Sequence, residues 1–365
     1  MLKLDIIAGA RPNFMKIAPI IHAIDKANKA ETKIRYRLVH TGQHYDTNMS
    51  GSFFGQLNIP PPHKNLNAGS GSQAEQTANI MTRYEKLLME EMPHICMVVG
   101  DVTSTMACAI TAKKMLVDVA HVEAGIRSGD MTMPEEINRI VTDSLTDYFF
   151  TTSTTANENL LKSGVDKQKI FFVGNTMIDT LLANRSRFMK PPVWDEKGLE
   201  KGQYIVITLH RPANVDEQNK LKNLISEIIH NSNNLPVIFP VHPRTEKVLK
   251  TAGVDHKNLY MVSPMSYLEF NYLVENAKAV ITDSGGITEE TTVMSVPCMT
   301  LRDNTERPET ITEGTNELLG TNPEAIKPAM QKLFAGKWKK GSIPEKWDGK
   351  TSERIVEVLA NVEVC

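Results

Sequence analysis

Residues 279–312 read AVITDSGGITEETTVMSVPCMTLRDNTERPETIT, and they contain an apolar run, a turn, a helix pattern, a second apolar run and a charged loop in direct succession. The run Ala279–Ile281 predicts a buried strand, and Ser284–Gly286 supply small residues where the chain must turn. A helix predicted from Ile287 onward presents free N–H groups and the positive end of its dipole to that turn. Because anions bind at such helix ends, the stretch predicts a nucleoside-diphosphate site beside the charged loop Arg302–Glu309.

Length and composition describe an ordinary globular protein. The 365 residues suggest about two domains. A net charge of −2 gives no electrostatic argument for binding nucleic acid or an anionic membrane. No apolar run approaches the roughly 20 residues of a membrane span. A strand pattern that starts at Leu2 leaves no room for a signal peptide. The scattered cysteines are expected to be reduced, so we expect a cytoplasmic protein.

The first half of the chain alternates apolar strands with helix patterns. Apolar runs without polar alternation are expected of parallel strands that are covered on both faces. The alternation therefore predicts a doubly wound α/β sheet with right-handed crossovers. The predicted strands include Leu4–Ala8, Tyr36–Thr41, Ile95–Val99 and Val117–Val122, and the predicted helices include Phe14–Ala27, Gln73–Met92, Thr103–Met115 and Pro134–Leu145.

The stretch Met189–Gln203 interrupts this pattern with prolines, glycines and charged residues, and it predicts an interdomain linker. The alternation restarts at Tyr204. We therefore expect a Rossmann-like domain at residues 1–188, a second at 204–350, and a C-terminal helix within 351–365 that packs back on the first domain. The ligand is expected between the carboxyl ends of both sheets.

Polar side chains follow the predicted strands of both halves. Ligands of open α/β sheets bind at the carboxyl ends of the strands, so these side chains form one candidate set. The set comprises Arg11, Lys16, Gln43, His44, Asp101, Glu123, Arg127, Glu135, Glu136, His210, His242, Ser284, Gly285, Gly286, Glu290 and Arg307.

Single members of the set have structural alternatives. Asp101 is placed to cap the helix that begins near Thr103. Glu123 follows a buried strand, so it must pair with Arg127 or take part in chemistry. Glu135 and its neighbour lie near a helix start, where the dipole alone explains acidic residues.

The motifs for common cofactors are missing from the sequence. No G-x-G-x-x-G follows the first strand, and no Walker-type lysine motif is present. His40 and His44 have no carboxylate or cysteine companion, so no metal is expected. Acids, a histidine and arginines around a diphosphate turn suit proton abstraction with departure of a phosphate leaving group.

The order of motifs resembles that of the non-hydrolysing UDP-N-acetylglucosamine 2-epimerases. The resemblance runs nearly end to end and implies the two-domain fold of B-type glycosyltransferases, a cytoplasmic homodimer, no cofactor, and a role in supplying surface polysaccharide. The matching motifs are GARPNFMKIAP, VGDVTST, HVEAGIRSGD, MPEEINR, VGNTMID, TLHRPAN, PVHPR, TDSGGITEE and RDNTERPE.

The resemblance also implies a reaction. UDP leaves C1 as the C2 proton is removed, and it adds back to the 2-acetamidoglucal with protonation on the other face. Residue roles follow motif by motif. Asp101, Glu123, Glu135 and His210 become the catalytic candidates, and Arg11, Lys16, Phe270, Ser284, Gly285, Gly286, Glu290 and Arg307 become substrate-binding candidates.

The chain departs from the family pattern at several places, among them the family's H-R-R-E segment, which reads His210-Arg211-Pro212-Ala213 here. The commoner first turn has Glu where this chain has Asn13. The segment through which many members bind a second UDP-sugar as activator is altered. Gln43 and His44 of that segment persist, and Gln43, Arg211 and His242 are the residues of a possible activator site.

Several alternatives stay open. One is the same reaction on a modified sugar such as a UDP-diacetamido uronic acid, because the Asn13 type of first turn occurs in such relatives. Others are a glycosyltransferase of the same fold, a hydrolysing epimerase and a UDP-sugar sensor. The glycosyltransferase and the sensor need no set of acids around C2.

Overall fold

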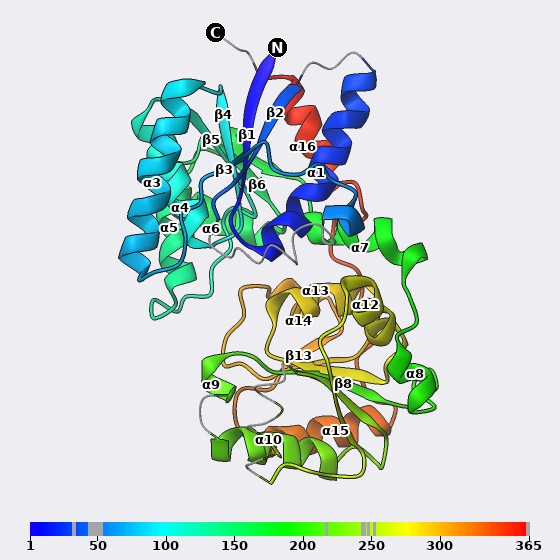
Figure 1. Cartoon of the computed structure of the whole chain (residues 1–365). Helices are drawn as coiled ribbons and strands as arrows, with labels where there is room; N and C mark the ends of the chain where they lie inside the picture. Colours follow the sequence, from blue (N-terminus) through cyan, green and yellow to red (C-terminus); the bar gives the residue numbers. More distant parts are fainter. Residues whose placement is uncertain are drawn as a thin grey trace. The chain divides into compact units, whose positions relative to one another are not determined.

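The chain forms two compact units in the computed structural model (Figure 1), which describes residues 1–30, 34–42, 54–215, 218–241, 246, 249–250 and 253–362. The first unit comprises Met1–Thr180 with Glu345–Cys365, and the second comprises Leu181–Pro344. The first unit ends before the predicted boundary at residue 188. The stretch 189–203, predicted as a linker, belongs to the second unit, where its Trp194 ring packs against two tyrosines.

The first unit is built on a parallel sheet, in which the described residues form seven strands in the order β3-β2-β1-β4-β5-β6-β7. All five residues of β4 are buried because helices cover both faces of the sheet. The strands are β1 (Leu2–Ala8), β2 (Ile34–His40), β3 (Lys64–Asn65), β4 (Ile95–Val99), β5 (Asp118–Val122), β6 (Tyr148–Thr151) and β7 (Ile170–Phe172).

Helices α3, α4 and α5 pack side by side on one face of this sheet, and α1 packs with α16 on the other (Figure 1). The chain returns to this unit through Trp347, which is fully buried and donates to the carbonyl of Thr152. The helices are α1 (Arg11–Lys29), α3 (Gln73–Glu90), α4 (Thr103–Lys114), α5 (Pro134–Leu145), α6 (Thr154–Lys162), α7 (Thr176–Asn184), which runs across the boundary, and α16 (Thr351–Ala360).

The second unit repeats the same plan. Its described strands form a parallel six-stranded sheet in the order β10-β9-β8-β11-β12-β13. The strands are β8 (Ile205–Thr208), β9 (Val237–Pro240), β10 (Leu259–Val262), β11 (Ala279–Thr282), β12 (Cys298–Thr300) and β13 (Asn316–Leu318).

The apolar stripe of α10, with buried Leu221, Leu224 and Ile225, packs with α15 in the core of this unit. The helices are α8 (Pro192–Glu196), α9 (Pro212–Val215), α10 (Gln218–His230), α12 (Tyr267–Asn276), α13 (Gly285–Val293), α14 (Glu309–Thr312) and α15 (Ile326–Phe334).

Both sheets reverse their strand order at one place, between β1 and β4 in the first unit and between β8 and β11 in the second. Ligands of open α/β sheets bind outside the carboxyl ends of the strands at such a reversal. Each unit therefore has one edge at which a site is expected.

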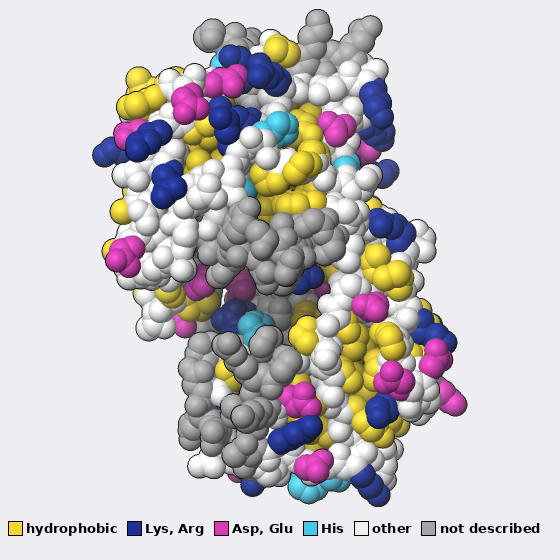
Figure 2. Space-filling view, viewed as in Figure 1, with side chains coloured by type: hydrophobic (Ala, Val, Ile, Leu, Met, Phe, Trp, Pro, Cys, Tyr) yellow, Lys and Arg dark blue, Asp and Glu magenta, His cyan; other side chains and the backbone are white. Residues whose placement is uncertain are grey.

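None of the described helices is both long and apolar enough to cross a membrane. On the face drawn in Figure 2, cationic and anionic side chains are interspersed over both units, in keeping with the net charge of −2.

Candidate active site

Asp101 lies two residues beyond the end of β4, at the strand reversal of the first unit. Its carboxylate forms an ion pair with Arg139 of α5, and its backbone carbonyl accepts from the Asn138 side chain at 2.8 Å. Asp101 keeps 30% of its side chain exposed, so it can still meet a ligand. The capping alternative is wrong, because Val102 is the N-cap of α4 and no side chain caps that helix.

Glu123 directly follows β5, and its partner is Lys16 of α1. The Lys16 Nζ lies 2.7 Å from the Glu123 Oε2, and both side chains are largely buried. The expected partner Arg127 instead donates to Asp143 at 2.6 Å. Glu123 has a φ of 73°, a left-handed conformation that costs a residue with a side chain roughly 1–3 kcal/mol. Such strain is typical of residues held for function.

The turns after β4 and β5 meet at Gly100. Its φ is 68°, and a Cβ there would lie 3.0 Å from the Lys16 Nζ. Glycine suits this left-handed turn and leaves room for the end of the Lys16 side chain beside Glu123. Lys16 and Glu123 are 107 positions apart in the chain, yet the fold brings them together with Asp101 at one edge of one sheet.

The neighbours Glu135 and Glu136 have different roles. Glu136 is buried, and its carboxylate accepts from the Ser128 and Gly129 N–H groups and from Arg139. Burial raises the pKa of Glu136, but these bonds outweigh burial and hold the pKa below its usual value. Glu135 is half-buried and has no hydrogen bond or ion pair with the part of the chain that the structure describes. Glu136 is thus structural, and Glu135 is available for chemistry.

The first turn of the unit is held by Asn13. Its Oδ1 accepts from the N–H groups of Gly9 and Ala10, and its Nδ2 donates to the carbonyl of Val99 at the end of β4. An ionised glutamate has no hydrogen to donate to that carbonyl. Asn13 is buried, whereas Arg11 beside it is exposed at the start of α1.

In the second unit, Asp283 follows β11 and organises the turn after β8. Its buried carboxylate accepts from the backbone N–H groups of His210 and Arg211 and from Asn214, and it lies 2.8 Å from the His210 Nδ1. Burial raises the pKa of Asp283, but the contacts with His210, the Arg211 N–H and Asn214 outweigh burial and hold the pKa below its usual value. The His210 ring is mostly exposed and held by its Nδ1 side.

Helix α13 begins at Gly285, two residues earlier than predicted, and Ser284 is its N-cap. A Cβ on Gly285 would lie 2.7 Å from the Glu306 carboxylate, whereas a Cβ on Gly286 would meet nothing within 4 Å. Gly285 therefore allows the Glu306 carboxylate to lie close to the helix backbone, and Gly286 leaves the N-terminal end of the helix open.

Glu290 lies one turn further along α13 and is buried. The Tyr267 hydroxyl of α12 donates to its Oε1 at 3.0 Å. Burial raises the pKa of Glu290 to about 7, although hydrogen bonds from Tyr267 and Asn271 lower it. Phe270 is half-buried on the same helix, α12, as Tyr267.

Arg307 is buried and forms an ion pair with Glu289 of α13. The guanidinium is therefore already fixed within the unit. Of the possible activator residues, Gln43 and His242 lie outside the described residues, whereas the Arg211 Nε donates to the Asp283 carbonyl.

Three residues of these arrangements were missed from sequence: Arg139, Asp283 and Tyr267. Arg139 had a signal, because it lies three residues after Glu136 on a helix, where side chains meet. Asp283 had one too, because it directly follows a strand. The position of Tyr267 carried none, since its partner lies on another helix.

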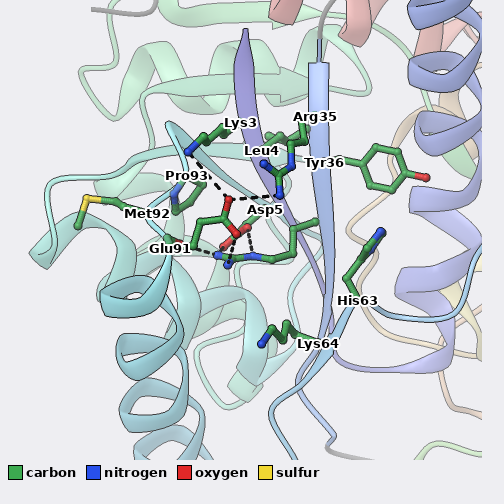
Figure 3. A pocket seen from close by; sticks show the side chains of 11 residues that line it. Lys3, Leu4, Asp5, Arg35, Tyr36, His63, Lys64, Glu91, Met92 and Pro93 are labelled. Carbon is green, nitrogen blue, oxygen red and sulfur yellow. Dashed lines mark hydrogen bonds and ion pairs between the residues drawn. The ribbon is translucent and has the colours of Figure 1, made fainter.

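A cavity of about 400 Å³ lies elsewhere in the first unit (Figure 3). Its walls include the first residues of β1 and β2, whereas the candidate residues follow the strand ends. Its cations are already paired. The Arg37 Nε lies 2.8 Å from Asp5, and Lys3, Arg35 and Arg37 surround Glu91. The cavity is therefore not where the candidate chemistry is gathered.

Known proteins share this organisation from end to end. The family model described as UDP-N-acetylglucosamine 2-epimerase matches residues 26–360. A UDP-N-acetylglucosamine 2-epimerase of Methanocaldococcus jannaschii is 42% identical over 98% of this chain and 99% of its own length. A UDP-2,3-diacetamido-2,3-dideoxy-D-glucuronate 2-epimerase of Pseudomonas aeruginosa is 36% identical over 99% of this chain and all of its own.

Solved structures agree with these relatives. The crystal structure of the M. jannaschii UDP-GlcNAc 2-epimerase in complex with UDP-GlcNAc and UDP has a TM-score of 0.86 at 42% identity, and it covers 99% of this chain and all of that one. The two-domain α/β fold expected from sequence is thus confirmed. The chain belongs to the UDP-N-acetylglucosamine 2-epimerase family.

Proposed function

We propose that this chain interconverts UDP-N-acetylglucosamine and UDP-N-acetylmannosamine by eliminating UDP and adding it back. The observation that carries the proposal is the pair Asp101 and Glu123. Both follow adjacent strands at the sheet reversal, and each is held by a basic side chain. Membership of the family supplies the reaction class.

The acids of the first unit move the C2 proton. One carboxylate takes the C2 proton, and the electron pair of the broken C2–H bond forms the C1–C2 double bond. UDP departs with the electrons of the C1–O bond. In the return step UDP attacks C1, and a carboxylic acid on the other face protonates C2. Asp101, Glu123 and Glu135 are proposed for these transfers. Lys16 and Arg11 would stabilise the charge on the phosphates.

The second unit holds UDP before and after the bond breaks. The α13 end at Ser284–Gly286 supplies N–H groups and the helix dipole to the diphosphate. Glu290 would accept hydrogen bonds from the ribose hydroxyls, and Phe270 would pack on the uracil base. His210, whose ring is held through Nδ1 by Asp283, would present its Nε2 to the leaving oxygen. Arg307 adds a fixed positive charge.

A UDP-diacetamido uronic acid is the second candidate substrate, because an epimerase of that sugar is 36% identical over 99% of this chain. Asn13 adds little to this alternative. Its side chain forms hydrogen bonds with three backbone groups, so Asn13 is explained by its role in anchoring the end of β4 and does not indicate which sugar binds.

The decisive measurement is exchange of the C2 proton with solvent. We expect deuterium at C2 of UDP-GlcNAc and of its epimer when the protein is incubated with UDP-GlcNAc in D₂O, without accumulation of free sugar. Exchange restricted to a carboxylated diacetamido sugar would select the second candidate. No exchange on any UDP-HexNAc would refute the epimerase proposal, and free sugar would indicate a hydrolysing enzyme.

UDP affinity is expected to rise with pH up to about 7, with a proton released on binding. Glu290 is protonated in the free enzyme below its pKa of about 7, and the ribose hydroxyls favour the ionised form because they donate to it. Affinity then grows by up to about tenfold per pH unit below pH 7 and levels off above it. Titration calorimetry in buffers of different ionisation enthalpy measures the proton.

The control is Glu290→Gln, which keeps the titration of UDP itself but lacks the carboxyl. We expect weaker binding and no protein-derived proton release. Glu275→Gln, on the exposed side of α12, should behave as the parent. Equal proton release by the parent and Glu290→Gln would remove Glu290 from the ribose site.

The proposal includes a cytoplasmic homodimer that supplies N-acetylmannosamine-type precursors for surface polysaccharide, as the resemblance implies.

A further inference from the structure

The fully buried ring of His121 joins two turns of the first unit. His121 lies on β5 and has no solvent exposure. Its Nδ1 lies 2.7 Å from an Asp143 carboxylate oxygen, and its Nε2 lies 2.9 Å from the Gly100 carbonyl oxygen. Both ring nitrogens are thus within hydrogen-bond distance of an oxygen.

Neither partner of the ring offers a hydrogen. The Gly100 carbonyl can only accept, so the Nε2 must carry hydrogen. The other oxygen of Asp143 accepts from the Gly125 N–H and lies 2.6 Å from the Arg127 guanidinium. Burial raises the pKa of Asp143, but its contacts with His121 and Arg127 outweigh burial and hold the pKa below its usual value, so the carboxylate is ionised. The Nδ1 must then donate as well. A neutral ring would turn a lone pair toward one of the two oxygens, which is unfavourable in a dry interior.

The two partners adjoin the candidate acids. Gly100 directly precedes Asp101, and its N–H donates to the Val122 carbonyl, directly before Glu123. Asp143 binds the N–H of Gly125, two residues after Glu123. His121 and Asp143 therefore fasten the turn that carries one acid to the turn that carries the other.

We propose that His121 is a positioning residue that acts as a buried imidazolium. By joining the Gly100 carbonyl to Asp143, it fixes the separation of Asp101 and Glu123 and supports the strained backbone of Glu123. The consequence for turnover rests on the function proposed above, whereas the charge and the geometry do not.

The charges around the ring fit this assignment. Arg127 from the loop after β5 shares Asp143 with the ring, and Lys16 from α1 neutralises Glu123. Arg139, on the same helix as Asp143, is shared by Asp101 and Glu136. With His121 as an imidazolium, every acid named in this cluster has at least one cationic side chain as its partner.

Neutron diffraction of the full chain near pH 8 tests the protonation directly. We expect deuterium on both ring nitrogens of His121, whereas His94, whose Nδ1 accepts from the Lys3 N–H, should carry none on its Nδ1. Deuterium on only one nitrogen of His121 would overturn the imidazolium. This result is independent of any enzymatic activity.

Variants test the positioning role. In His121→Asn one side-chain amide cannot span both partners, so we expect kcat to fall about 100-fold, the effect of roughly an ångström of misplacement. KM and UDP affinity should change much less than kcat, because most of the proposed UDP contacts belong to the second unit and the variant leaves them unchanged. The kcat is taken per folded molecule, with the folded fraction measured by circular dichroism.

His94→Gln is the matched control and should retain parental kcat. A folded His121→Asn protein with kcat within twofold of the parent would refute the positioning role. A variant that does not fold leaves the neutron result to decide. A parent that shows no C2 exchange would instead refute the proposed function and leave the protonation of His121 as it is found.

Discussion

Replacing Glu123 with glutamine is expected to lower kcat by about 10²- to 10⁴-fold, the usual contribution of a positioned proton-transfer group. Glutamine keeps the shape of the side chain, and its oxygen can still accept from Lys16, which lies 2.7 Å from the carboxylate. What disappears is the ability to take or return a proton. The measurement is steady-state turnover of UDP-GlcNAc together with deuterium incorporation at C2.

The affinity for UDP separates this role from a general loss of structure. Most of the proposed UDP contacts belong to the second unit, and Lys16 keeps its charge, so Glu123→Gln should bind UDP nearly as the parent does. Glu85→Gln, on the exposed side of α3, is a matched control and should keep full turnover. Loss of UDP binding in the Glu123 variant would show that the role is wrong, and so would turnover within tenfold of the parent.

Asp101→Asn and Glu135→Gln extend the same comparison. Asp101 is held by Arg139, whereas Glu135 has no partner among the described residues. A variant that loses exchange from one epimer but retains it from the other identifies the acid on that face of the sugar. Together, the three variants therefore show which of the three acids removes the C2 proton and which returns it.

Local patterns in the sequence were sufficient for the strands that carry the site. Ile95–Val99 forms β4 as predicted, because five consecutive apolar residues bounded by glycine suit a strand covered on both faces. The positions of Asp101 and Glu123 after strands then follow from chain order alone.

Partners across the fold were not predictable in this way. Arg127, four residues away, was the one partner that the sequence suggested for Glu123, but the structure pairs Glu123 with Lys16 of α1, which is 107 positions away in the chain. That pairing depends on the approach of α1 to β5 across Gly100, which no local pattern encodes. The start of α13 was misplaced for a related reason. Glycine has low helix propensity, yet Gly285 begins the helix, at a position where a Cβ would lie 2.7 Å from the Glu306 carboxylate.

Removal of Arg139 is expected to cost the first unit about 3–5 kcal/mol of unfolding free energy, the cost of breaking a buried ion pair by deleting one partner. Arg139 is 3% exposed and binds both Asp101 and Glu136. Methionine fills a similar length but offers no donor, so Arg139→Met leaves Glu136 with the Ser128 and Gly129 donors only. Urea unfolding followed by circular dichroism measures the loss.

The dependence on pH follows from Glu136. Its pKa in the folded parent lies below the usual value, so it contributes stability above the ordinary carboxyl range that is lost as the pH falls through the folded pKa. Without Arg139 the folded pKa rises, so the deficit of Arg139→Met should shrink as the pH is lowered through that range. Adding Glu136→Gln should recover part of the loss at neutral pH, because the buried charge is then gone.

The matched control for Arg139 is Arg185→Met, which breaks the exposed ion pair with Glu275. An exposed pair contributes about 0–1 kcal/mol, so this variant should unfold nearly as the parent does. A loss below about 1 kcal/mol in Arg139→Met would contradict the buried network. Equal losses at pH 8 and at a pH below the ordinary carboxyl range would show that Glu136 is not the group left without compensation, because only an ionisable partner makes the deficit depend on pH.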